Sequence, residues 1–350
     1  MRVRLKTKAI TVYLCTVALT SACVLLIIHF NGRDIESKSR SFDHMAVDRV
    51  MLAHEQKGLW VPEDKPALVN FMEKEPAHPR QEDSVKKAKI SHLPDVKDLS
   101  PTEQLTSLSR ARVANLSYAD LSELYHSYVM TIQYECHNIV RLGRVTDGGW
   151  EICGDEMFVP KSKCLVYSFG VGDDFSFDDA AARNYKCEVH SFDPSMKQSD
   201  HVRESTVHFH KKGLADFNGE TNSGWKVGTL ESIKHELGHQ ERPLAILKID
   251  IEEWEWQVLP EILSTQSLSD VKQFLIELHA CETCSVFNPQ LIDKEPTKER
   301  YIKALNLFKS LYHLGFRIFW SHKNNACKYV SRFGLKERSA CHELHMVRVS

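Results

Sequence analysis

Residues 165–174 read LVYSFGVGDD, a mostly apolar run followed at once by a glycine pair and two acids. A short apolar run of this kind predicts a buried strand, and Gly170 and Gly172 predict a tight turn at its end. The helical pattern that follows, around residues 177–185, would begin with free backbone N–H groups. The segment therefore predicts a strand, a glycine turn and a helix that can approach a ligand closely.

The same alternation continues along the chain. Further strands are predicted at residues 188–192, 207–210, 244–251, 273–278, 316–320 and 344–349, and helices at residues 229–239, 254–263 and 301–314. Strands that alternate with helices at this spacing predict a mainly parallel sheet with helices on both faces. The last two strands follow each other without a long helix, which favours an antiparallel hairpin at one edge. Such sheets bind ligands at the carboxyl ends of their strands.

The composition is that of a globular protein, with 42% apolar and 26% charged residues. Its 350 residues allow one large domain or two ordinary ones. The formal charge of −2 provides no basic field for phosphate groups, so a dedicated nucleic-acid-binding protein is not expected.

The N-terminus carries a candidate membrane anchor. Residues 9–30 are uncharged and residues 1–8 are rich in Arg and Lys, and a bilayer-spanning helix needs about 20 apolar residues. We therefore predict a signal-anchor at 9–30, a short basic cytosolic tail at 1–8, and the rest of the chain in the lumen of the secretory pathway (ER or Golgi). The alternative is a signal peptide cleaved near Ser21 and Ala22, which would release a secreted protein, but the most hydrophobic part of the run follows that point.

Two further features agree with a luminal domain. Asn115-Leu116-Ser117 is an N-glycosylation acceptor, and an even number of cysteines lies outside the predicted span. Residues 31–115 hold half of the prolines and mixed charges without an apolar period, so we predict a flexible stem there. The folded domain is predicted at 116–350. It begins with a helix, because apolar residues recur at three- and four-residue steps from Leu121 to Val140.

Polar groups at the strand ends indicate a cofactor site. Asp193 ends the strand after the glycine turn, where an acid can accept hydrogen bonds from a ribose diol. The third glycine of a dinucleotide fingerprint is missing, and Asp173 and Asp174 follow Gly172 instead, where acids would repel a pyrophosphate but not a sulfonium. This pattern favours S-adenosylmethionine over NAD. The alternative is an ordinary strand–helix turn, in which Asp193 only caps the turn at Pro194.

Residues 248–256 read KIDIEEWEW and place several acids at the end of the strand predicted at 244–251. Acids suit the first turn of a helix, which accounts for Glu253 and Glu255. Asp250, at the strand terminus, would instead point into the cleft. His279 ends the next predicted strand and is either a catalytic base or an ordinary strand-end polar residue.

Four segments of the chain resemble the methyltransferase-like protein 24 family, which is distantly similar to the FkbM-type methyltransferases. They are residues 147–153 (DGGWEIC), 167–178 (YSFGVGDDFSFD), 188–195 (EVHSFDPS) and 248–256 (KIDIEEWEW). The resemblance covers about residues 118–350. It implies an α/β fold with a Rossmann-like methyltransferase sheet of seven strands, mostly parallel with an antiparallel edge hairpin, and S-adenosyl-L-methionine as the cofactor. Ser168 departs from the pattern, because an acid often stands there, and so does Glu253, where FkbM-type chains usually carry glycine.

The predicted site combines the residues and the resemblance. The candidate cofactor-binding residues are Ser168, Gly170, Gly172, Asp193 and Asp250. Asp250 is the first candidate for a catalytic base and His279 the second. The methyl acceptor is not identified by the sequence. Two alternatives remain open: a luminal glycosyltransferase, whose Asp-x-Asp motif is only approximated at residues 250–252, and a non-catalytic secreted binding domain on the same scaffold.

Residues 235–239 read HELGH, which matches the HExxH pattern of zinc proteases. Pro243 and a buried strand follow where such a protease would continue its helix, with Glu261 as a distant third ligand. We therefore interpret this motif as a surface helix and predict no metal site.

The cysteines allow two interpretations. A four-thiolate zinc site could be formed by Cys281, Cys284, Cys327 and Cys341. Disulfides are favoured instead, because the predicted lumen is oxidising. Cys136 and Cys153 flank the turn predicted at 147–149 and are a candidate disulfide pair.

Overall fold

The structure is a computed structural model that describes residues 99–146, 148–204, 206–281 and 295–349. The predicted cytosolic tail (1–8), the predicted signal-anchor (9–30) and most of the predicted stem lie outside these residues. Among the described helices, none combines the length and the apolar character that a membrane crossing requires.

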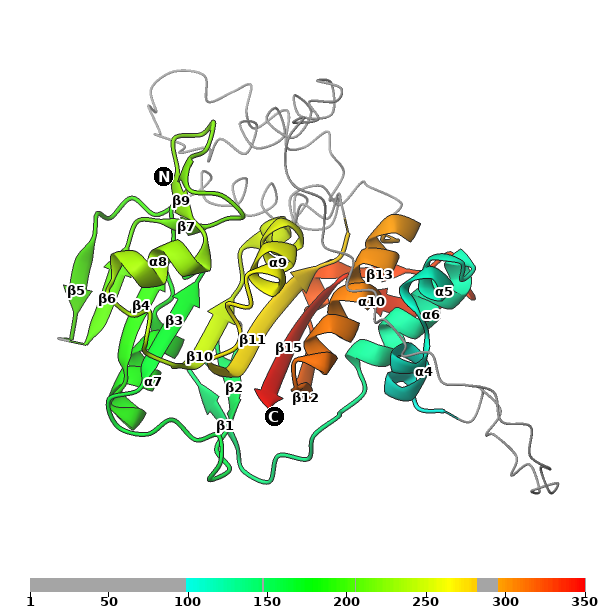
Figure 1. Cartoon of the computed structure of the whole chain (residues 1–350), viewed down its shortest axis with the longest axis horizontal. Helices are drawn as coiled ribbons and strands as arrows, with labels where there is room; N and C mark the ends of the chain where they lie inside the picture. The colour runs from blue at the N-terminus through cyan, green and yellow to red at the C-terminus, as the bar shows by residue number, and fades with distance from the viewer. Residues whose placement is uncertain (1–98, 147, 205, 282–294, 350) are drawn as a thin grey trace, which may run out of the picture. The chain divides into compact units, whose positions relative to one another are not determined.

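An eight-stranded sheet forms the centre of the described domain, in the order β12-β15-β11-β10-β3-β4-β6-β5 (Figure 1). The parallel strands are β3 (Leu165–Phe169), β4 (Glu188–Phe192), β6 (Val207–His210), β10 (Leu244–Ile249) and β11 (Val271–His279). β15 (Cys341–Arg348) runs antiparallel both to β11 and to β12 (Phe316–Lys323), so the mainly parallel sheet with an antiparallel edge hairpin is confirmed.

The strand number was predicted one too low. β5 (His201–Arg203) adds an eighth strand, antiparallel to β6, at the edge of the sheet opposite the hairpin. Its three residues are intermediate or exposed in their burial and show no apolar run. Such a short edge strand leaves no periodic signal in the sequence.

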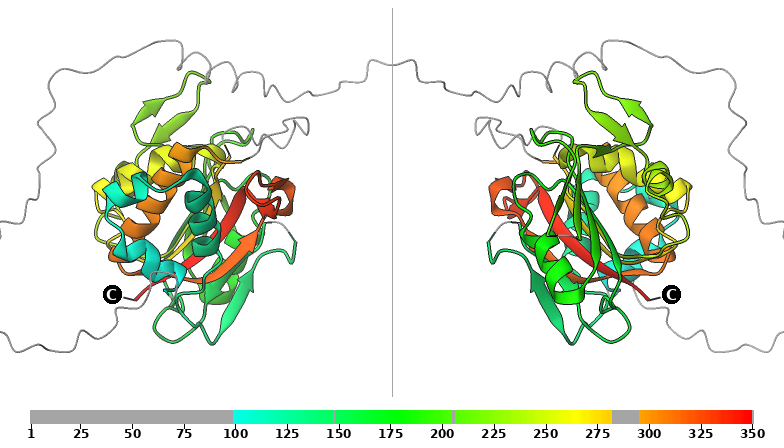
Figure 2. Two further views of the ribbon diagram at one scale, coloured as in Figure 1. Left: turned by 90° about the vertical axis from the view of Figure 1, so that its right-hand side faces the viewer. Right: turned by 90° about the vertical axis from the view of Figure 1, so that its left-hand side faces the viewer.

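Helices cover both faces of the sheet, as Figure 2 shows. α8 (Leu230–Glu236), α9 (Glu255–Ser264) and α10 (Lys298–His313) pack on one face, and α7 (Ser176–Tyr185) packs on the other. Neighbouring strand residues alternate between the two resulting cores: Tyr167 and Leu247 belong to the first, Val166 and Ile246 to the second. Because both faces are buried, the central strands read as continuous apolar runs.

The packed domain begins earlier than residue 116, the predicted boundary. α4 (Pro101–Ser107) and α5 (Arg110–Ala114) lie within the predicted stem, yet Leu105 and Val113 are fully buried in the core shared with α10. Ser100 and Glu103 form a capping box at the start of α4. Each of these helices buries few residues, so their periodicity is too weak to separate them from the stem.

The first long helix ends earlier than predicted. α6 (Tyr118–Val129) stops well before Val140, and residues 139–142 instead form β1 (Ile139–Leu142), which pairs with β2 (Trp150–Cys153). The disulfide Cys136–Cys153 closes this hairpin, as predicted. The spacing of apolar residues continues past Val129 by coincidence, and cross-strand pairing with the disulfide overrides it.

The described cysteines form disulfides and do not provide free thiolates for zinc. Cys164 pairs with Cys187, Cys327 pairs with Cys341, and Cys281 is also disulfide-bonded. Cys284 lies outside the described residues. The four-thiolate zinc alternative is therefore wrong, because at least three of its four sulfurs are not free thiolates.

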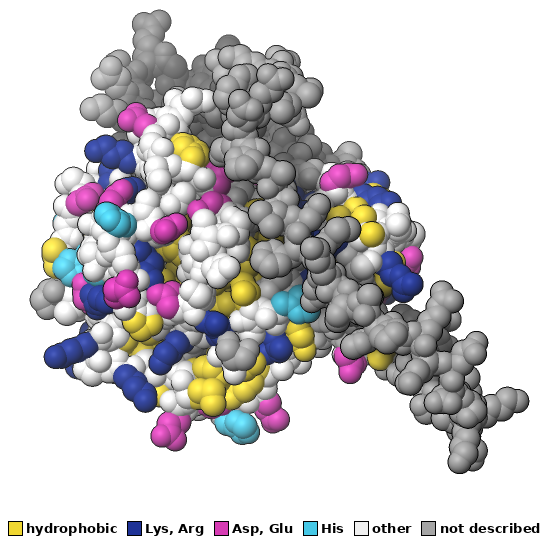
Figure 3. Space-filling view, in the orientation of Figure 1, with side chains coloured by type: hydrophobic (Ala, Val, Ile, Leu, Met, Phe, Trp, Pro, Cys, Tyr) yellow, Lys and Arg dark blue, Asp and Glu magenta, His cyan; other side chains and the backbone are white. Residues whose placement is uncertain are grey.

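Two small sheets complete the described domain: β7 (Gly213–Leu214), β8 (Gly219–Glu220) and β9 (Lys226–Gly228) form one, β13 (Lys328–Val330) and β14 (Glu337–Ser339) the other. On the face seen in Figure 3, acidic and basic side chains intermingle over β4, β6 and α8. This face offers no continuous basic field of the kind that binds phosphate backbones.

Candidate active site

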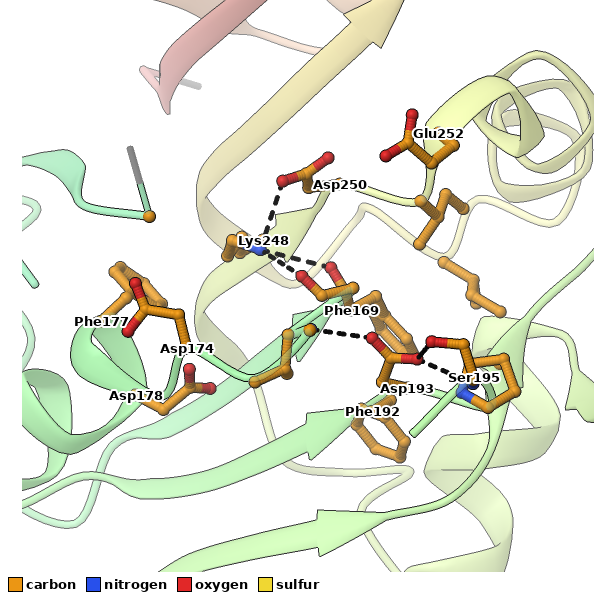
Figure 4. Close-up of a pocket in the computed structure, with 18 of the residues that line it drawn as sticks. Phe169, Asp174, Phe177, Asp178, Phe192, Asp193, Ser195, Lys248, Asp250 and Glu252 are labelled. Atoms are coloured by element: carbon orange, nitrogen blue, oxygen red, sulfur yellow. Dashed lines mark hydrogen bonds and ion pairs between the residues drawn. The ribbon is translucent and has the colours of Figure 1, made fainter. Parts of the chain in front are cut away.

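A cavity of about 550 Å³ lies at the carboxyl ends of β3, β4 and β10, where parallel sheets bind ligands (Figure 4). Four of the five predicted cofactor-binding residues line it: Gly170, Gly172, Asp193 and Asp250. Ser168, the fifth, does not line it, because it is fully buried within β3 at 0% exposure. The position that often carries an acid in the resembling family thus lies beneath the cavity.

The glycine turn after β3 lets two backbone segments touch. Gly170 has a φ of +77°, and a Cβ there would lie 1.5 Å from the carbonyl oxygen of Asp250. Gly172 has a φ of +56°, but a Cβ there would meet nothing within 4 Å. Gly170 is therefore required by contact between the β3 and β10 loops, whereas Gly172 borders open space beside the cavity.

Asp193 connects the glycine turn with the turn after β4. Its Oδ2 accepts a 2.8 Å hydrogen bond from the backbone N–H of Gly172, and its Oδ1 accepts from the backbone N–H and the hydroxyl of Ser195. The residue is only 6% exposed. The predicted capping role is therefore present. Oδ1 already accepts two hydrogen bonds, whereas Oδ2 accepts one and has a second lone pair with which to accept from a ligand.

The ammonium group of Lys248 connects the glycine turn after β3 with Asp250 after β10. Its Nζ donates to the carbonyl oxygens of Gly170 at 3.0 Å and Phe169 at 3.4 Å, and it lies 3.9 Å from the carboxylate of Asp250. The ammonium also lies 5.1 Å from the centre of the Trp150 ring. Sequence reasoning assigned Lys248 no role, although it stands two residues before Asp250 at a buried strand position, where an unpaired ammonium would be costly.

Two carboxylates border the cavity at the end of β10. Burial raises the pKa of Asp250 above its ordinary value, against the opposing charges of Lys248 and His279. Glu252 has a φ of +59°, in the left-handed region that non-glycine residues rarely adopt, and its side chain is 78% exposed. Glu252 was not among the predicted site residues, and its sequence signals were its place in the acidic stretch after β10 and the approximated Asp-x-Asp motif at residues 250–252.

His279 lies outside the cavity lining, at the buried end of β11. Its Nδ1 is 3.3 Å from Glu255, and its Nε2 is 3.4 Å from Glu252 and 3.9 Å from Glu277. Burial alone would lower the pKa of His279, but the surrounding carboxylates, Glu255 first, raise it well above its ordinary value. These contacts favour the imidazolium form, which cannot accept a proton, and the structure brings Asp250 rather than His279 to the cavity.

The acids around His279 are also close enough to be considered as metal ligands. Asp250, Glu255 and His279 each bring one ligand atom within 4.8 Å of the others. A cation could bind there only if His279 gave up its proton, and Glu252 and Glu255 beside its two ring nitrogens oppose that loss. The cluster is therefore better explained as a buried ion-pair network.

The HExxH motif does not form a zinc-protease helix. α8 ends at Glu236, and Gly238 follows with a φ of +71°. His235 is exposed, whereas His239 is buried and its Nδ1 lies 2.8 Å from the hydroxyl of Tyr167. The two histidines do not lie on one helical face. The predicted surface helix at residues 235–239 is present only at His235 and Glu236, and His239 is buried.

Comparisons with known proteins find methyltransferases and probable methyltransferase-like proteins. The chain is 28% identical to "Probable methyltransferase-like protein 24" of Homo sapiens over 56% of its own length, and 30% identical to the protein of the same name of Rattus norvegicus over 57%. The chain spans about 56% of the length of each of these curated relatives. A solved structure of a "putative tRNA (m1A22) methyltransferase" from Streptococcus pneumoniae, in complex with S-adenosyl-L-methionine, aligns with a TM-score of 0.27 and 8% identity, over 55% of this chain and 68% of that one.

The match to a protein family is broader. The family described as "Methyltransferase domain" matches residues 100–328, which begin one residue before α4 and end in β13. The match therefore includes the glycine turn, Asp193, Asp250 and both faces of the sheet. The resemblance noted from the four sequence segments is confirmed, and the chain belongs to the Methyltransferase domain family.

Proposed function

We propose that this chain is an S-adenosylmethionine-dependent methyltransferase of the secretory pathway, and that the cavity at the ends of β3, β4 and β10 binds the cofactor. The observation that carries the proposal is the connection between Gly172 and Asp193 at the cavity rim. It places an acid with spare acceptor capacity beside an open glycine turn, which is the arrangement that a ribose diol requires.

The charge of the cavity supports a cationic cofactor. Its lining includes Arg144 and Lys248 as basic residues, and Lys248 is already bound to backbone carbonyls. The acids in the lining outnumber them: Asp173, Asp174, Asp178, Asp193, Asp250 and Glu252. This excess of negative charge would repel a pyrophosphate and attract a sulfonium and an ammonium group. The residues present therefore fit S-adenosylmethionine better than NAD or a nucleotide sugar.

The chain's own residues would align the reactants and take up a proton. When bound, the cofactor supplies a methyl group activated by its positively charged sulfur. An oxygen or nitrogen acceptor must lose a proton as its bond to the methyl carbon forms, and Asp250 is the carboxylate that borders the cavity at the end of the central strand. Lys248 fixes the carbonyls of the glycine turn and so fixes the distance between the two loops. Alignment of this kind can contribute several kcal/mol, and a general base about 10²–10⁴-fold in rate.

Two observations support the luminal location. Disulfides bond the described cysteines within the domain, and such bonds persist in oxidising compartments. Asn115 is exposed at the end of α5, so a glycan there would extend into solvent. The predicted signal-anchor at 9–30 would tether this domain to the membrane.

A thermal-shift panel on the full chain tests the cofactor class. S-adenosylmethionine and S-adenosylhomocysteine should each raise the melting temperature, because a ligand that binds only the folded state stabilises it. NAD should give no shift. A shift produced by a UDP-sugar with manganese, without one from either S-adenosyl compound, would indicate a glycosyltransferase. No shift with any of the ligands would indicate a non-catalytic binding domain, and either result would overturn the proposal.

A further inference from the structure

Four histidines gather on the sheet away from the cavity. His190 lies in β4, His208 and His210 lie in β6, and His239 follows α8. The ring of His190 stacks on those of His208 and His210, with centroids 4.8 and 5.1 Å apart, and meets the ring of His239 at 4.9 Å and 78°. None of the four lines the cavity, so the proposed function leaves this cluster unexplained.

Three ligand atoms converge within this cluster. The Oε1 atom of Glu188 lies 3.0 Å from Nε2 of His190 and 3.7 Å from Nε2 of His239, and all three atoms lie within 4.8 Å of one another. Ligands bound to zinc at about 2.0–2.1 Å in tetrahedral geometry lie roughly 3.4 Å apart. The two measured separations bracket that value.

The other atoms of these ligands are already held in place. Nδ1 of His190 lies 2.9 Å from Nε2 of His210, and Nδ1 of His239 lies 2.8 Å from the hydroxyl of Tyr167. The second carboxylate oxygen of Glu188 accepts a 2.9 Å hydrogen bond from Arg242. Metal-binding histidines in proteins are oriented in this way, with one nitrogen held by a neighbour and the other directed at the metal.

We propose that Glu188, His190 and His239 form a binding site for a zinc-class divalent cation. Two imidazole nitrogens and one carboxylate oxygen are donors that suit zinc, whereas magnesium and calcium prefer oxygen alone. The Glu188 side chain is 35% exposed, so solvent could supply a fourth ligand. The ion would join β4 to the connection between α8 and β10, two segments that lie far apart in the sequence.

The protonation of the ligands is compatible with metal binding near neutral pH. Burial lowers the pKa of His190 to about 4 and also lowers that of His239. The guanidinium of Arg242, 2.9 Å from Glu188, favours the carboxylate form of that residue. Two neutral imidazoles and one carboxylate are the forms that bind a metal.

This site differs from the one that HExxH suggests. His239 is the second histidine of that motif, but its partners come from β4 and not from α8. His235 and Glu236 take no part, and Glu236 pairs with Lys212 instead. His235 therefore provides a matched control, because it belongs to the same motif and is exposed.

The test is metal binding by the untagged full chain after dialysis against a chelator. Wild type should take up about one equivalent of zinc with submicromolar affinity and give the visible absorption bands of tetrahedral cobalt when cobalt replaces zinc. His239→Gln retains a hydrogen-bonding group for Tyr167 and should bind zinc at least ten-fold more weakly. His235→Gln should bind zinc as wild type does.

Glu188→Gln provides a second variant in case His239→Gln does not fold, since Glu188 is partly exposed and the amide has the same shape. It should also lose zinc affinity at least ten-fold. Equal zinc binding by wild type and a folded variant of either ligand would overturn the proposal. Loss of zinc in His235→Gln to the same extent as in His239→Gln would overturn it too, because the metal would then follow the HExxH motif.

Discussion

At the scale of single residues, Gly170 and Gly172 have similar backbone conformations and different reasons for them. Gly170 is in contact with the backbone of Asp250, so a side chain there would push two loops apart. A Cβ at Gly172 would have no neighbour within 4 Å, so a side chain there would project only into the space beside the cavity. The fold requires the first glycine, and we predict that ligand binding requires the second.

Gly172→Ala should separate folding from cofactor binding. The left-handed φ of +56° costs an alanine about 1 kcal/mol, so the variant should fold with a slightly lower melting temperature. Its methyl group should weaken S-adenosylhomocysteine binding at least ten-fold by calorimetry. Gly334→Ala, with a φ of +74° outside the cavity, carries the same backbone cost and should bind normally. Equal affinity of the two variants would show that the ligand does not approach the glycine turn.

Asp250→Asn should reduce turnover on an identified acceptor by about 10²–10⁴-fold while the cofactor still binds. A base must be deprotonated to act, so the wild-type rate should fall as pH decreases through the pKa of Asp250. Burial raises that pKa, so the fall should occur at a higher pH than for an ordinary carboxyl group. Asp173→Asn removes an exposed acid from the same cavity and should change turnover far less. Full turnover in Asp250→Asn would place the base elsewhere.

At the scale of elements, α4 and α5 are part of the folded domain rather than of the stem. Leu105 and Val113 are fully buried against the core that α6 and α10 share. Removal of the whole predicted stem, up to residue 115, would therefore delete both helices and expose apolar surface of the core.

Leu105→Ala tests that assignment. Removing a fully buried leucine side chain from a core costs about 2–5 kcal/mol, so denaturant unfolding should show a clear loss of stability. Leu335→Ala makes the same chemical change at a position that is 79% exposed and should alter the free energy of unfolding by about 0.5 kcal/mol or less. Equal stability of the two variants would indicate that residues 101–114 belong to the stem and not to the folded domain.

At the scale of the whole molecule, buried histidines link stability to pH. Burial lowers the pKa of His126 to about 2 and that of His342 to about 3. Both residues bind protons more readily in the unfolded chain than in the folded one. Protonation of the unfolded chain therefore lowers the free energy of unfolding progressively as the pH falls below the ordinary pKa of 6.5, and has no effect well above it. At pH 5 each costs about 2 kcal/mol of stability. His279 has the opposite sign, because its pKa is raised in the folded state.

The melting temperature should therefore fall between pH 7 and pH 5, and His342→Phe should reduce that fall. His342 is fully buried, and neither ring nitrogen has a hydrogen-bond partner among the described residues. A phenylalanine has a similar shape and cannot take up a proton. His313→Phe, in the last turn of α10, serves as the control for a surface-side histidine. An unchanged pH dependence in His342→Phe would show that this histidine does not limit acid stability.

Topology is also a property of the whole molecule. If the domain is luminal, the full chain expressed in mammalian cells should carry a glycan at Asn115, seen as a mobility shift that glycosidase removes. Asn115→Gln should abolish the shift, and the wild-type glycoprotein should stay with membranes after a carbonate wash. An unglycosylated chain, or a glycoprotein recovered from the medium, would contradict the anchored luminal topology.

The sequence predicted the central strands because they are buried on both faces and read as apolar runs. It also predicted the positions of Gly170, Gly172, Asp193 and Asp250, since residues at strand ends meet at one edge of a parallel sheet. It could not show that Ser168 lies beneath the cavity. The ion pairs of His279 with Glu252 and Glu255 join residues from separate parts of the chain, so no local pattern encodes them.

Calorimetric titration of the full chain with S-adenosylhomocysteine, for wild type and Asp193→Ala, tests the central claim most directly. The wild-type chain should bind one equivalent. Loss of the charge-assisted hydrogen bonds to a ribose diol should cost about 2–3 kcal/mol of binding free energy, which raises the dissociation constant of the variant by roughly 30- to 150-fold. A thermal melt of each protein would confirm that both are folded. No binding by wild type, or equal affinity in the folded variant, would contradict the assignment of this cavity to the cofactor.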